Sequence, residues 1–268
     1  MNQKPKGIIL DLDGTVCLGD HAIPGSPEAI AALRARGISI VFVSNTTDTR
    51  EEYAQRLENL DIPVTPEEII QTPVVLRHYL ETEHPRATLY VIGIPSLKQE
   101  LEPFFAFSED PKEIDIVIAS LDTELNFAML TTAFHALRNG ARFVATNIDP
   151  TAPFAEGELP DAAGVISFLE ATTGRKLEVN IGKPSPFMLN AALDHLDLPP
   201  QATLLVGDRL ETDIVMAKDA GIPSVLVLSG VTRRHELAQA AIQPTFVLPN
   251  LAGLPALLDT LDGAGGAA

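Results

Sequence analysis

The sequence predicts an α/β protein with a doubly wound parallel sheet and a second, smaller α/β domain inserted into it. Short apolar runs alternate with stretches of helical length along the chain. Polar residues follow directly after several of these runs, as they do where parallel strands end in an open sheet. The alternation starts afresh beyond a polar, proline-containing segment at residues 81–88, which we interpret as a linker.

The first predicted strand is the apolar run 7–10, which leads into Asp11 and Asp13 and then into Gly14-Thr15. Side chains at positions i and i+2 of an extended chain point the same way, so the two carboxylates lie side by side. Like charges this close repel each other unless a cation or a shared proton intervenes. The pair therefore indicates a metal ion and different roles for the two acids.

Two other interpretations of this pair are possible from its spacing. A helix N-cap or an Asx turn accounts for many aspartates at strand ends. An EF-hand calcium loop also opens with this spacing, but it needs a preceding helix and a Glu at loop position twelve, where this chain has Ala22.

The second predicted strand, 38–43, follows a helix at 26–36 that Gly37 ends. Strand, crossover helix and strand form a right-handed parallel unit, so Ser44 and Asn45 are expected at the same sheet edge as Asp11. A helix-capping run before the helix predicted at 50–60 is the alternative interpretation. An amphipathic stretch at 66–81 precedes the linker.

The inserted region contains predicted strands followed by polar runs. We expect strands at 89–92, 114–119 and 143–145, and helices at 96–101, 125–137 and 161–172. Ser120-Leu121-Asp122 and Thr146-Asn147-Ile148-Asp149 follow two of these strands. A strand-end turn explains Asp122 equally well. For Asn147 and Asp149 we favour a contact with substrate.

The last third of the chain supplies a lysine and two further acids. Lys183 lies between glycine and proline in the run VNIGKPSP, before a helix at 185–196. The strand 204–206 leads to Asp208, and Asp213 follows in the first turn of the next helix. Acids in a first turn are usually partners of the helix dipole, which explains Asp213 but not Asp208. Strands at 224–228 and 246–248 complete the first sheet.

The composition excludes several classes of function. The net charge of −17 and the lack of a long basic block argue against a nucleic-acid polymer as partner. The N-terminal apolar run is too short for a signal peptide or a membrane span, so we expect a cytoplasmic protein without a membrane partner. Cys17 is the sole cysteine and is expected to be a packed side chain. No G-x-G-x-x-G or P-loop run occurs.

Four strand-end motifs occur in the order DLDGT, SN, GKP and GDRLETD. In this order they resemble those of the haloacid dehalogenase (HAD) superfamily of phosphatases. Over its whole length the chain is similar to the branch with a large α/β (C2-type) cap, the NagD and p-nitrophenyl phosphatase group. The resemblance implies a Rossmann-like HAD catalytic core at 1–82 and 180–268, and an inserted α/β cap domain at 83–179.

The resemblance further implies a magnesium-dependent phosphatase acting on small phosphorylated metabolites of the nucleotide or sugar phosphate type. Asp11 is the expected nucleophile, and Asp13 the general acid that then serves as general base. Mg²⁺ is expected on the carboxylates of Asp11 and Asp208 and on the main-chain carbonyl of Asp13, with Asp213 anchoring its water shell. Dehalogenases lack the second acid and ion-pumping ATPases replace it with threonine, so Asp13 favours a phosphatase.

Phosphate oxygens are expected to bind Ser44 and Lys183, assisted by backbone N–H groups near Gly14 and Asn45. An aspartate attacks a phosphate dianion only where charge is neutralised, which a cation and a lysine achieve. The chain departs from the family pattern at Thr46, where asparagine is frequent, and at Ile148, where the cap loop often has proline. Substrate choice is therefore open.

Three alternatives to this function were considered. A phosphoacceptor receiver domain is about half this length and leaves the inserted domain unexplained. A regulator that binds a phosphorylated ligand without turnover would not need catalytic residues, yet this chain has all of the catalytic residue types. A phosphotransferase or mutase of the same superfamily is the nearest enzymatic alternative. A homodimer formed through the cap is a further expectation from the resemblance.

Overall fold

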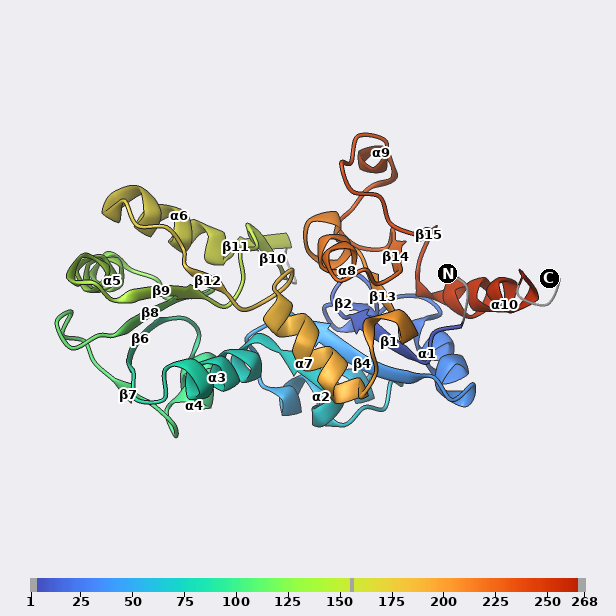
Figure 1. Ribbon diagram of the computed structural model, residues 1–268, viewed down its shortest axis with the longest axis horizontal. Helices are drawn as coiled ribbons and strands as arrows, with labels where there is room; N and C mark the ends of the chain where they lie inside the picture. Colours follow the sequence, from blue (N-terminus) through green and yellow to red (C-terminus); the bar gives the residue numbers. More distant parts are fainter. Residues whose placement is uncertain (1–3, 155–156, 265–268) are drawn as a thin grey trace. The chain divides into compact units, whose positions relative to one another are not determined.

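The computed structural model describes residues 4–154 and 157–264, which form two compact units (Figure 1). The first unit contains the chain up to Ser44, the segment Arg50–Ile70 and the chain from Leu189 onward. The second contains Asn45–Thr49 and Gln71–Met188. The chain therefore leaves the first unit and returns to it, as expected for an inserted domain.

The first unit is built on a six-stranded sheet in the order β15-β14-β13-β1-β4-β5. The pairs from β15 to β4 are parallel, and in their register Leu10 of β1 lies between Val206 of β13 and Phe42 of β4. This confirms the predicted doubly wound parallel sheet. The strands are β1 (Gly7–Asp11), β4 (Ser39–Ser44), β5 (Ile69–Gln71), β13 (Thr203–Gly207), β14 (Ser224–Val227) and β15 (Phe246–Leu248).

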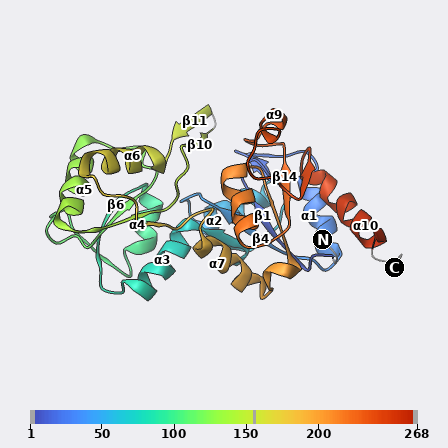
Figure 2. The same cartoon turned by 45° about the horizontal axis from the view of Figure 1, so that its top comes forward.

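Helices pack on both faces of this sheet. The helices α1 (Ser26–Ala35), α2 (Arg50–Glu58) and α10 (Leu254–Ala264) share one apolar core with alternate residues of the strands. Figure 2 shows α10 beside α1, and Arg36 at the end of α1 forms an ion pair with Asp259 of α10. On the other face, Leu196 of α7 (Pro186–Leu196) packs against Gly7, and α8 (Val215–Asp219) precedes β14.

The second unit has its own five-stranded parallel sheet, in the order β12-β9-β8-β6-β7. Helices α5 (Phe127–Asn139) and α6 (Ala162–Thr173) pack on one face in a separate apolar core, whereas α3 (Thr72–Glu83) and α4 (Pro95–Leu101) contact each other (Figure 1). The strands are β6 (Thr88–Ile92), β7 (Ala106–Phe107), β8 (Ile116–Ala119), β9 (Arg142–Ala145) and β12 (Val179–Asn180).

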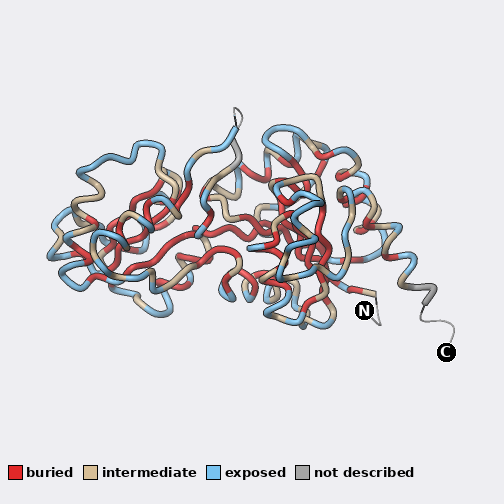
Figure 3. Tube along the Cα trace, turned by 90° about the horizontal axis from the view of Figure 1, so that it is seen from above, coloured by how far each residue is buried: buried red, intermediate tan, exposed pale blue. Residues whose placement is uncertain are grey.

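The interior strands of both sheets, such as β1 and β8, are buried along their whole length, whereas β7, β12 and β15 at the sheet edges are partly or fully exposed; buried stretches of the chain are red in Figure 3. Residues that lie between two helical layers lose solvent on both faces, which explains why the interior strands read as continuous apolar runs rather than as alternating ones. Among the described residues, none of the helices has the length and apolar composition that crossing a membrane requires.

The amphipathic stretch 66–81 does not form one continuous helix. It begins with a short 3₁₀ helix, Pro66–Glu68, and the edge strand β5, and only from Thr72 does it continue as α3. Ile69 and Ile70 are β-branched and buried, so pairing at the sheet edge outweighs the helical periodicity.

Several short elements were not predicted. Two hairpins join β2 (Cys17–Leu18) to β3 (His21–Ala22) and β10 (Thr151–Phe154) to β11 (Gly157–Pro160). The elements β7 and β12 were also missed, because runs of two residues carry no periodic signal. The remaining elements are α9 (Arg234–Leu237), a π-helical turn at Leu210–Ile214, and 3₁₀ turns at Pro200–Ala202 and Leu251–Gly253.

The segment at 81–88 was interpreted as a linker between domains. By its contacts α3 belongs to the second unit, and the chain passes from the first unit to the second at Ile70–Gln71. The domain boundaries given above, 1–82 and 180–268 for the core and 83–179 for the cap, stay a prediction.

A first prediction concerns the N-terminus of α5. The Asn126 side chain accepts hydrogen bonds from the backbone N–H groups of Ala128 and Met129, at 3.0 and 3.2 Å. We expect Asn126→Ala to weaken this first turn by about 1 kcal/mol and to speed hydrogen exchange at those two amides. Asn126→Asp keeps the acceptor and is expected to exchange as the wild type does. Equal acceleration in both variants would contradict a capping role.

Candidate active site

Asp11 ends strand β1 and is almost fully buried, with 4% of its surface exposed. The loop after it is wound tightly, because the backbone N–H groups of Thr15, Val16 and Cys17 all donate to the carbonyl of Leu12. Gly14 has a φ of 91°, a conformation that favours glycine. The Thr15 hydroxyl donates to Asp11 Oδ2 at 2.8 Å. This hydrogen bond holds the Asp11 carboxylate in a defined orientation.

Three buried acids meet at this edge of the sheet. Asp11, Asp208 and Asp213 each offer one carboxylate oxygen, and these oxygens lie within 4.8 Å of one another. The parallel register of β1 and β13 brings Asp11 and Asp208 together, since both follow paired strands. Buried carboxylates this close need a positive charge or protons between them. An all-oxygen donor set of this kind suits a hard divalent cation.

Backbone contacts fix the two acids that follow β13. Asp208 Oδ2 accepts a hydrogen bond from the backbone N–H of Val231 at 2.5 Å, and Asp213 Oδ2 accepts one from the N–H of Arg209 at 3.1 Å. Asp213 lies in the π-helical turn rather than in an ordinary first helical turn. The extra residue of that turn gives a backbone form that often accompanies functional sites.

Glycines make room for these carboxylates. A Cβ added at Gly14 would lie 2.5 Å from Asp208 Oδ2, and one added at Gly230 would collide with the same carboxylate. A Cβ at Gly207 would collide with the side chain of Asp213. Backbone therefore passes directly over both acids, and only glycine allows that approach.

The side chain of Asp13 has different neighbours. Its Oδ2 accepts a hydrogen bond from Tyr53 at 2.6 Å and a longer one from Ser44 at 3.5 Å, and its Oδ1 accepts one from Arg56 at 3.0 Å. The two acids predicted to have different roles are thus held by different groups. Asp11 faces the other buried acids, while Asp13 faces a hydroxyl, a phenol and a guanidinium.

Tyr53 and Arg56 were not singled out from the sequence. They lie three residues apart on α2, in the polar run REEYAQRLE, where an aromatic and a basic residue on one helix face give only a weak signal. Burial, and then the charge of Asp13, raises the pKa of Tyr53 well above its ordinary value. Burial alone would lower the pKa of Arg56, but the negative charge of Asp13 helps to raise it overall. Tyr53 is therefore a neutral donor and Arg56 a cation.

Cys17 is the small packed side chain that the sequence predicts. It is fully buried, and burial together with the nearby charge of Asp13 raises the pKa of its thiol to about 11. A thiol with so high a pKa is a poor nucleophile at neutral pH.

A second polar group lies in the second unit and is organised by Asn45. Its Oδ1 accepts a hydrogen bond from the backbone N–H of Lys183 at 2.7 Å, and its Nδ2 donates to Asp149 at 2.8 Å. A Cβ at Gly182 would lie 2.6 Å from Asn45 Oδ1, so this loop also requires glycine. Asn147 Oδ1 accepts a hydrogen bond from the backbone N–H of Asp149 at 3.0 Å. The four predicted residues Asn45, Asn147, Asp149 and Lys183 are thus brought together.

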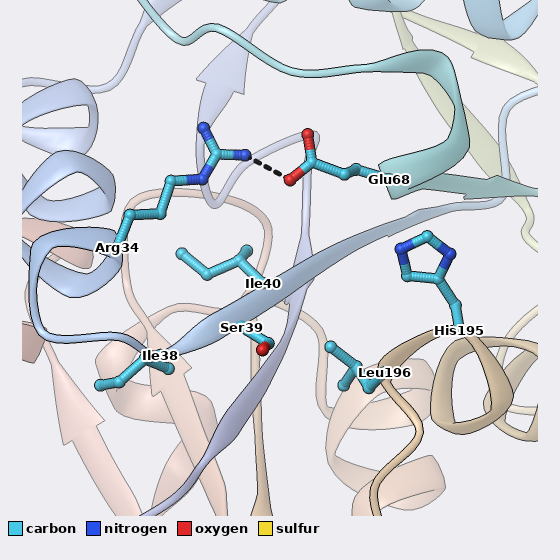
Figure 4. A pocket seen from close by; sticks show the side chains of 7 residues that line it. All are labelled: Arg34, Ile38, Ser39, Ile40, Glu68, His195 and Leu196. Carbon is cyan, nitrogen blue, oxygen red and sulfur yellow. Dashed lines mark hydrogen bonds and ion pairs between the residues drawn. The ribbon is translucent and has the colours of Figure 1, made fainter.

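The pocket shown in Figure 4 is separate from the buried acids Asp11, Asp208 and Asp213. It has a volume of about 280 Å³ and includes the start of β4, at the sheet edge opposite Ser44, together with Arg34, Glu68 and His195. Arg34 and Glu68 form an ion pair across it at 2.7 Å. None of the predicted site residues lines it, so it has no part in the candidate active site.

Comparison with known proteins places the chain in a family. Residues 8–104 match the family model described as haloacid dehalogenase-like hydrolase, and residues 180–254 match a second model described as HAD-hydrolase-like. An acid sugar phosphatase of Staphylococcus haemolyticus is 34% identical over 92% of this chain and 94% of its own length. The 5′-nucleotidase YutF of Bacillus subtilis is 32% identical over 92% of this chain and 96% of its own.

Solved structures agree with this assignment. A 4-nitrophenylphosphatase from Thermotoga maritima superposes with a TM-score of 0.88 at 32% identity, covering 94% of this chain and 97% of its own. NagD from E. coli superposes with a TM-score of 0.84 at 28% identity, covering 93% and 98%. The motifs, the fold and these similarities together show that the chain belongs to the haloacid dehalogenase-like hydrolases, in the group of NagD and the p-nitrophenyl phosphatases.

Proposed function

We propose that this protein is a magnesium-dependent phosphatase that hydrolyses small phosphomonoesters through an aspartyl phosphate on Asp11. The observation that carries the proposal is the group of three buried carboxylates at one edge of the parallel sheet, with Asp11 at the end of the interior strand β1. The names of the relatives, which include a sugar phosphatase and a nucleotidase, support sugar phosphates or nucleotides as the substrate class.

The proposed metal ligands are the carboxylates of Asp11 and Asp208 and the main-chain carbonyl of Asp13, with Asp213 anchoring metal-bound water. The donor set fits the cation, because every side-chain group offered is a carboxylate oxygen and all three acids are buried. When bound, Mg²⁺ supplies the positive charge that lets a carboxylate approach a phosphate dianion.

The reaction proceeds in two displacements. Asp11 attacks phosphorus, so a bond forms between its carboxylate oxygen and the phosphorus as the bond to the substrate's alcohol oxygen breaks. Asp13 gives its proton to that departing oxygen. Asp13, now ionised, then takes a proton from a water molecule, which attacks phosphorus and releases inorganic phosphate and the Asp11 carboxylate.

The phosphate oxygens are proposed to bind Ser44 and Lys183, together with backbone N–H groups near Gly14 and Asn45. Lys183 is buried, with 5% of its surface exposed, and the hydrogen bonds of its backbone to Asn45 fix its loop. A fixed cation of this kind attracts an anionic substrate locally, against the repulsion of a chain with net charge −17.

Asn147 and Asp149 are retained as proposed contacts with the substrate's leaving group. Their hydrogen bond to each other and the bond from Asn45 to Asp149 also support a role in holding this loop in shape. Ile148 between them is 42% exposed and provides the loop with an apolar side chain. Such a loop favours a substrate that has both hydroxyl and apolar surface.

The remaining expectations stay predictions. They are a cytoplasmic location, no nucleic-acid polymer or membrane as partner, and a homodimer formed through the cap. A phosphotransferase or mutase has the same first displacement but passes the phosphoryl group to an acceptor alcohol. Release of inorganic phosphate that is unaffected by added sugar acceptors would separate hydrolysis from that alternative.

Asp11→Asn tests the nucleophile. The substitution removes the attacking charge, so we expect turnover of p-nitrophenyl phosphate to fall on the order of a thousandfold. Chelation by EDTA is expected to stop the wild type, and added Mg²⁺ to restore it. Asp259→Asn, which alters an exposed ion pair, serves as the matched control and is expected to keep full activity. Metal-independent turnover, or turnover that survives Asp11→Asn, would contradict the proposal.

Gly230→Ala tests the metal site without removing a ligand. The added methyl group collides with the Asp208 carboxylate, so we expect weaker magnesium binding. At a concentration about 100 times Kd, Mg²⁺ stabilises the wild type by about 2.7 kcal/mol, and this gain is expected to shrink in the variant. Thermal unfolding with and without Mg²⁺ measures it. Gly164→Ala, in open space on α6, is the control, and an unchanged gain in Gly230→Ala would contradict the assignment.

Lys183→Met tests the phosphate contact. Loss of a preorganised charge is expected to cost several kcal/mol of transition-state stabilisation, which lowers kcat/KM on the order of a hundredfold or more. Lys176→Met removes a lysine whose side chain is 82% exposed and is expected to leave kcat/KM unchanged. Near-normal kcat/KM in Lys183→Met would end its proposed role.

A further inference from the structure

The carboxylate of Asp13 is held at both of its oxygens by two side chains of one helix. Tyr53 donates to Oδ2 at 2.6 Å, and Arg56 donates from Nη2 to Oδ1 at 3.0 Å. Both donors come from α2, where they lie almost one turn apart. A carboxylate gripped at both oxygens loses rotation about its last side-chain bond, so these two contacts determine where its oxygens point.

The side chain of Arg56 is itself held in place by several contacts. Its guanidinium stacks over the Tyr53 ring at 4.0 Å from the ring centroid, and its Nη2 lies 3.7 Å from the Cys17 sulfur. Its Nε is buried and makes no hydrogen bond among the described residues. The contacts with Asp13 and Tyr53 therefore involve the end of the guanidinium and its face.

Arg36 and Arg56 are about equally exposed, but the acid that Arg36 contacts, Asp259, has 60% of its side chain exposed, whereas Asp13 has 25%. Tyr53 is also unusual, since its phenol is buried on a helix of low mean hydropathy and its hydroxyl points at an acid. The arrangement serves Asp13.

We infer that Tyr53 and Arg56 are positioning residues that orient the carboxylate of Asp13 for its two proton transfers. This inference rests on the proposed function. In the first displacement Asp13 gives its proton to the leaving oxygen, and in the second it takes one from water. Each transfer requires an Asp13 oxygen within hydrogen-bond reach of the reacting oxygen, and a misplacement of about 1 Å can cost a hundredfold.

Loss of these contacts to Asp13 is expected to lower kcat/KM more for some substrates than for others. A poor leaving group depends on a proton from Asp13, whereas p-nitrophenolate leaves readily without one. The probes are a series of substituted phenyl phosphates, from p-nitrophenyl to unsubstituted phenyl phosphate. In Arg56→Met we expect kcat/KM for phenyl phosphate to fall on the order of tenfold or more, and that for p-nitrophenyl phosphate by less than about threefold. Tyr53→Phe is expected to act in the same direction with a smaller effect.

Conservative and control variants separate positioning from general damage. Arg56→Lys keeps the charge but not the fork geometry, so it is expected to recover part of the loss with phenyl phosphate. Arg36→Met and Tyr79→Phe make the same chemical changes elsewhere and are expected to leave the whole series unchanged. The rise in Tm caused by Mg²⁺ is expected to be the same in Arg56→Met as in the wild type. A merely structural role for Arg56 would lower kcat/KM equally across the series, and that result would overturn the inference.

A double-mutant cycle gives the second test. Once Asp13→Asn has removed the proton donor, adding Arg56→Met is expected to change kcat/KM by less than about twofold, because the two residues act as one unit. Independent effects that multiply would overturn the inference. The proposed function fails separately, through loss of the dependence on Mg²⁺ or survival of Asp11→Asn. If the wild type is active and depends on Mg²⁺, but Arg56→Met shows the same dependence of kcat/KM on the leaving group as the wild type, the inference is wrong and the proposed function still holds.

Discussion

Mutual repulsion among three buried carboxylates is the constraint on which the site depends. Asp11, Asp208 and Asp213 lie where water is excluded, and their oxygens are within 4.8 Å of one another. A fold tolerates such a group only if a cation compensates it or protons neutralise it. The parallel pairing of β1 and β13 imposes this proximity, because it aligns the ends of the two strands. The proposed Mg²⁺ would relieve this repulsion on binding.

Backbone packs closely around these acids and restricts where their side chains can lie. Gly14 and Gly230 both lie against Asp208, and Gly207 lies against Asp213. Side chains at these positions would push the acids apart. The acids would then repel each other less, and they would be less well placed to bind the proposed cation. In the second unit Gly182 gives Asn45 the same close approach to the loop of Lys183. At these four positions glycine allows backbone to lie against a polar side chain of the candidate site.

Asp11 and Asp13 have different surroundings, which supports the separate roles proposed for them. They are two residues apart, yet Asp11 contacts Thr15 and the other buried acids, whereas Asp13 contacts Tyr53 and Arg56. The strand ends with Asp11, and the loop that follows turns the second side chain toward α2. Pairs of acids with opposed environments are the usual basis for separate nucleophilic and acid–base roles.

The sequence by itself determined the parallel α/β class and the strand-end positions of Asp11, Ser44 and Asp208, because apolar runs that stop at polar residues are local signals. Only the tertiary structure decided that Tyr53 and Arg56 reach Asp13, about forty residues away in the chain, and that Ile69–Gln71 forms an edge strand. Hydrogen bonds between distant segments depend on how helices pack on a sheet. The periodic pattern of one segment does not identify the residues that contact it in the folded protein.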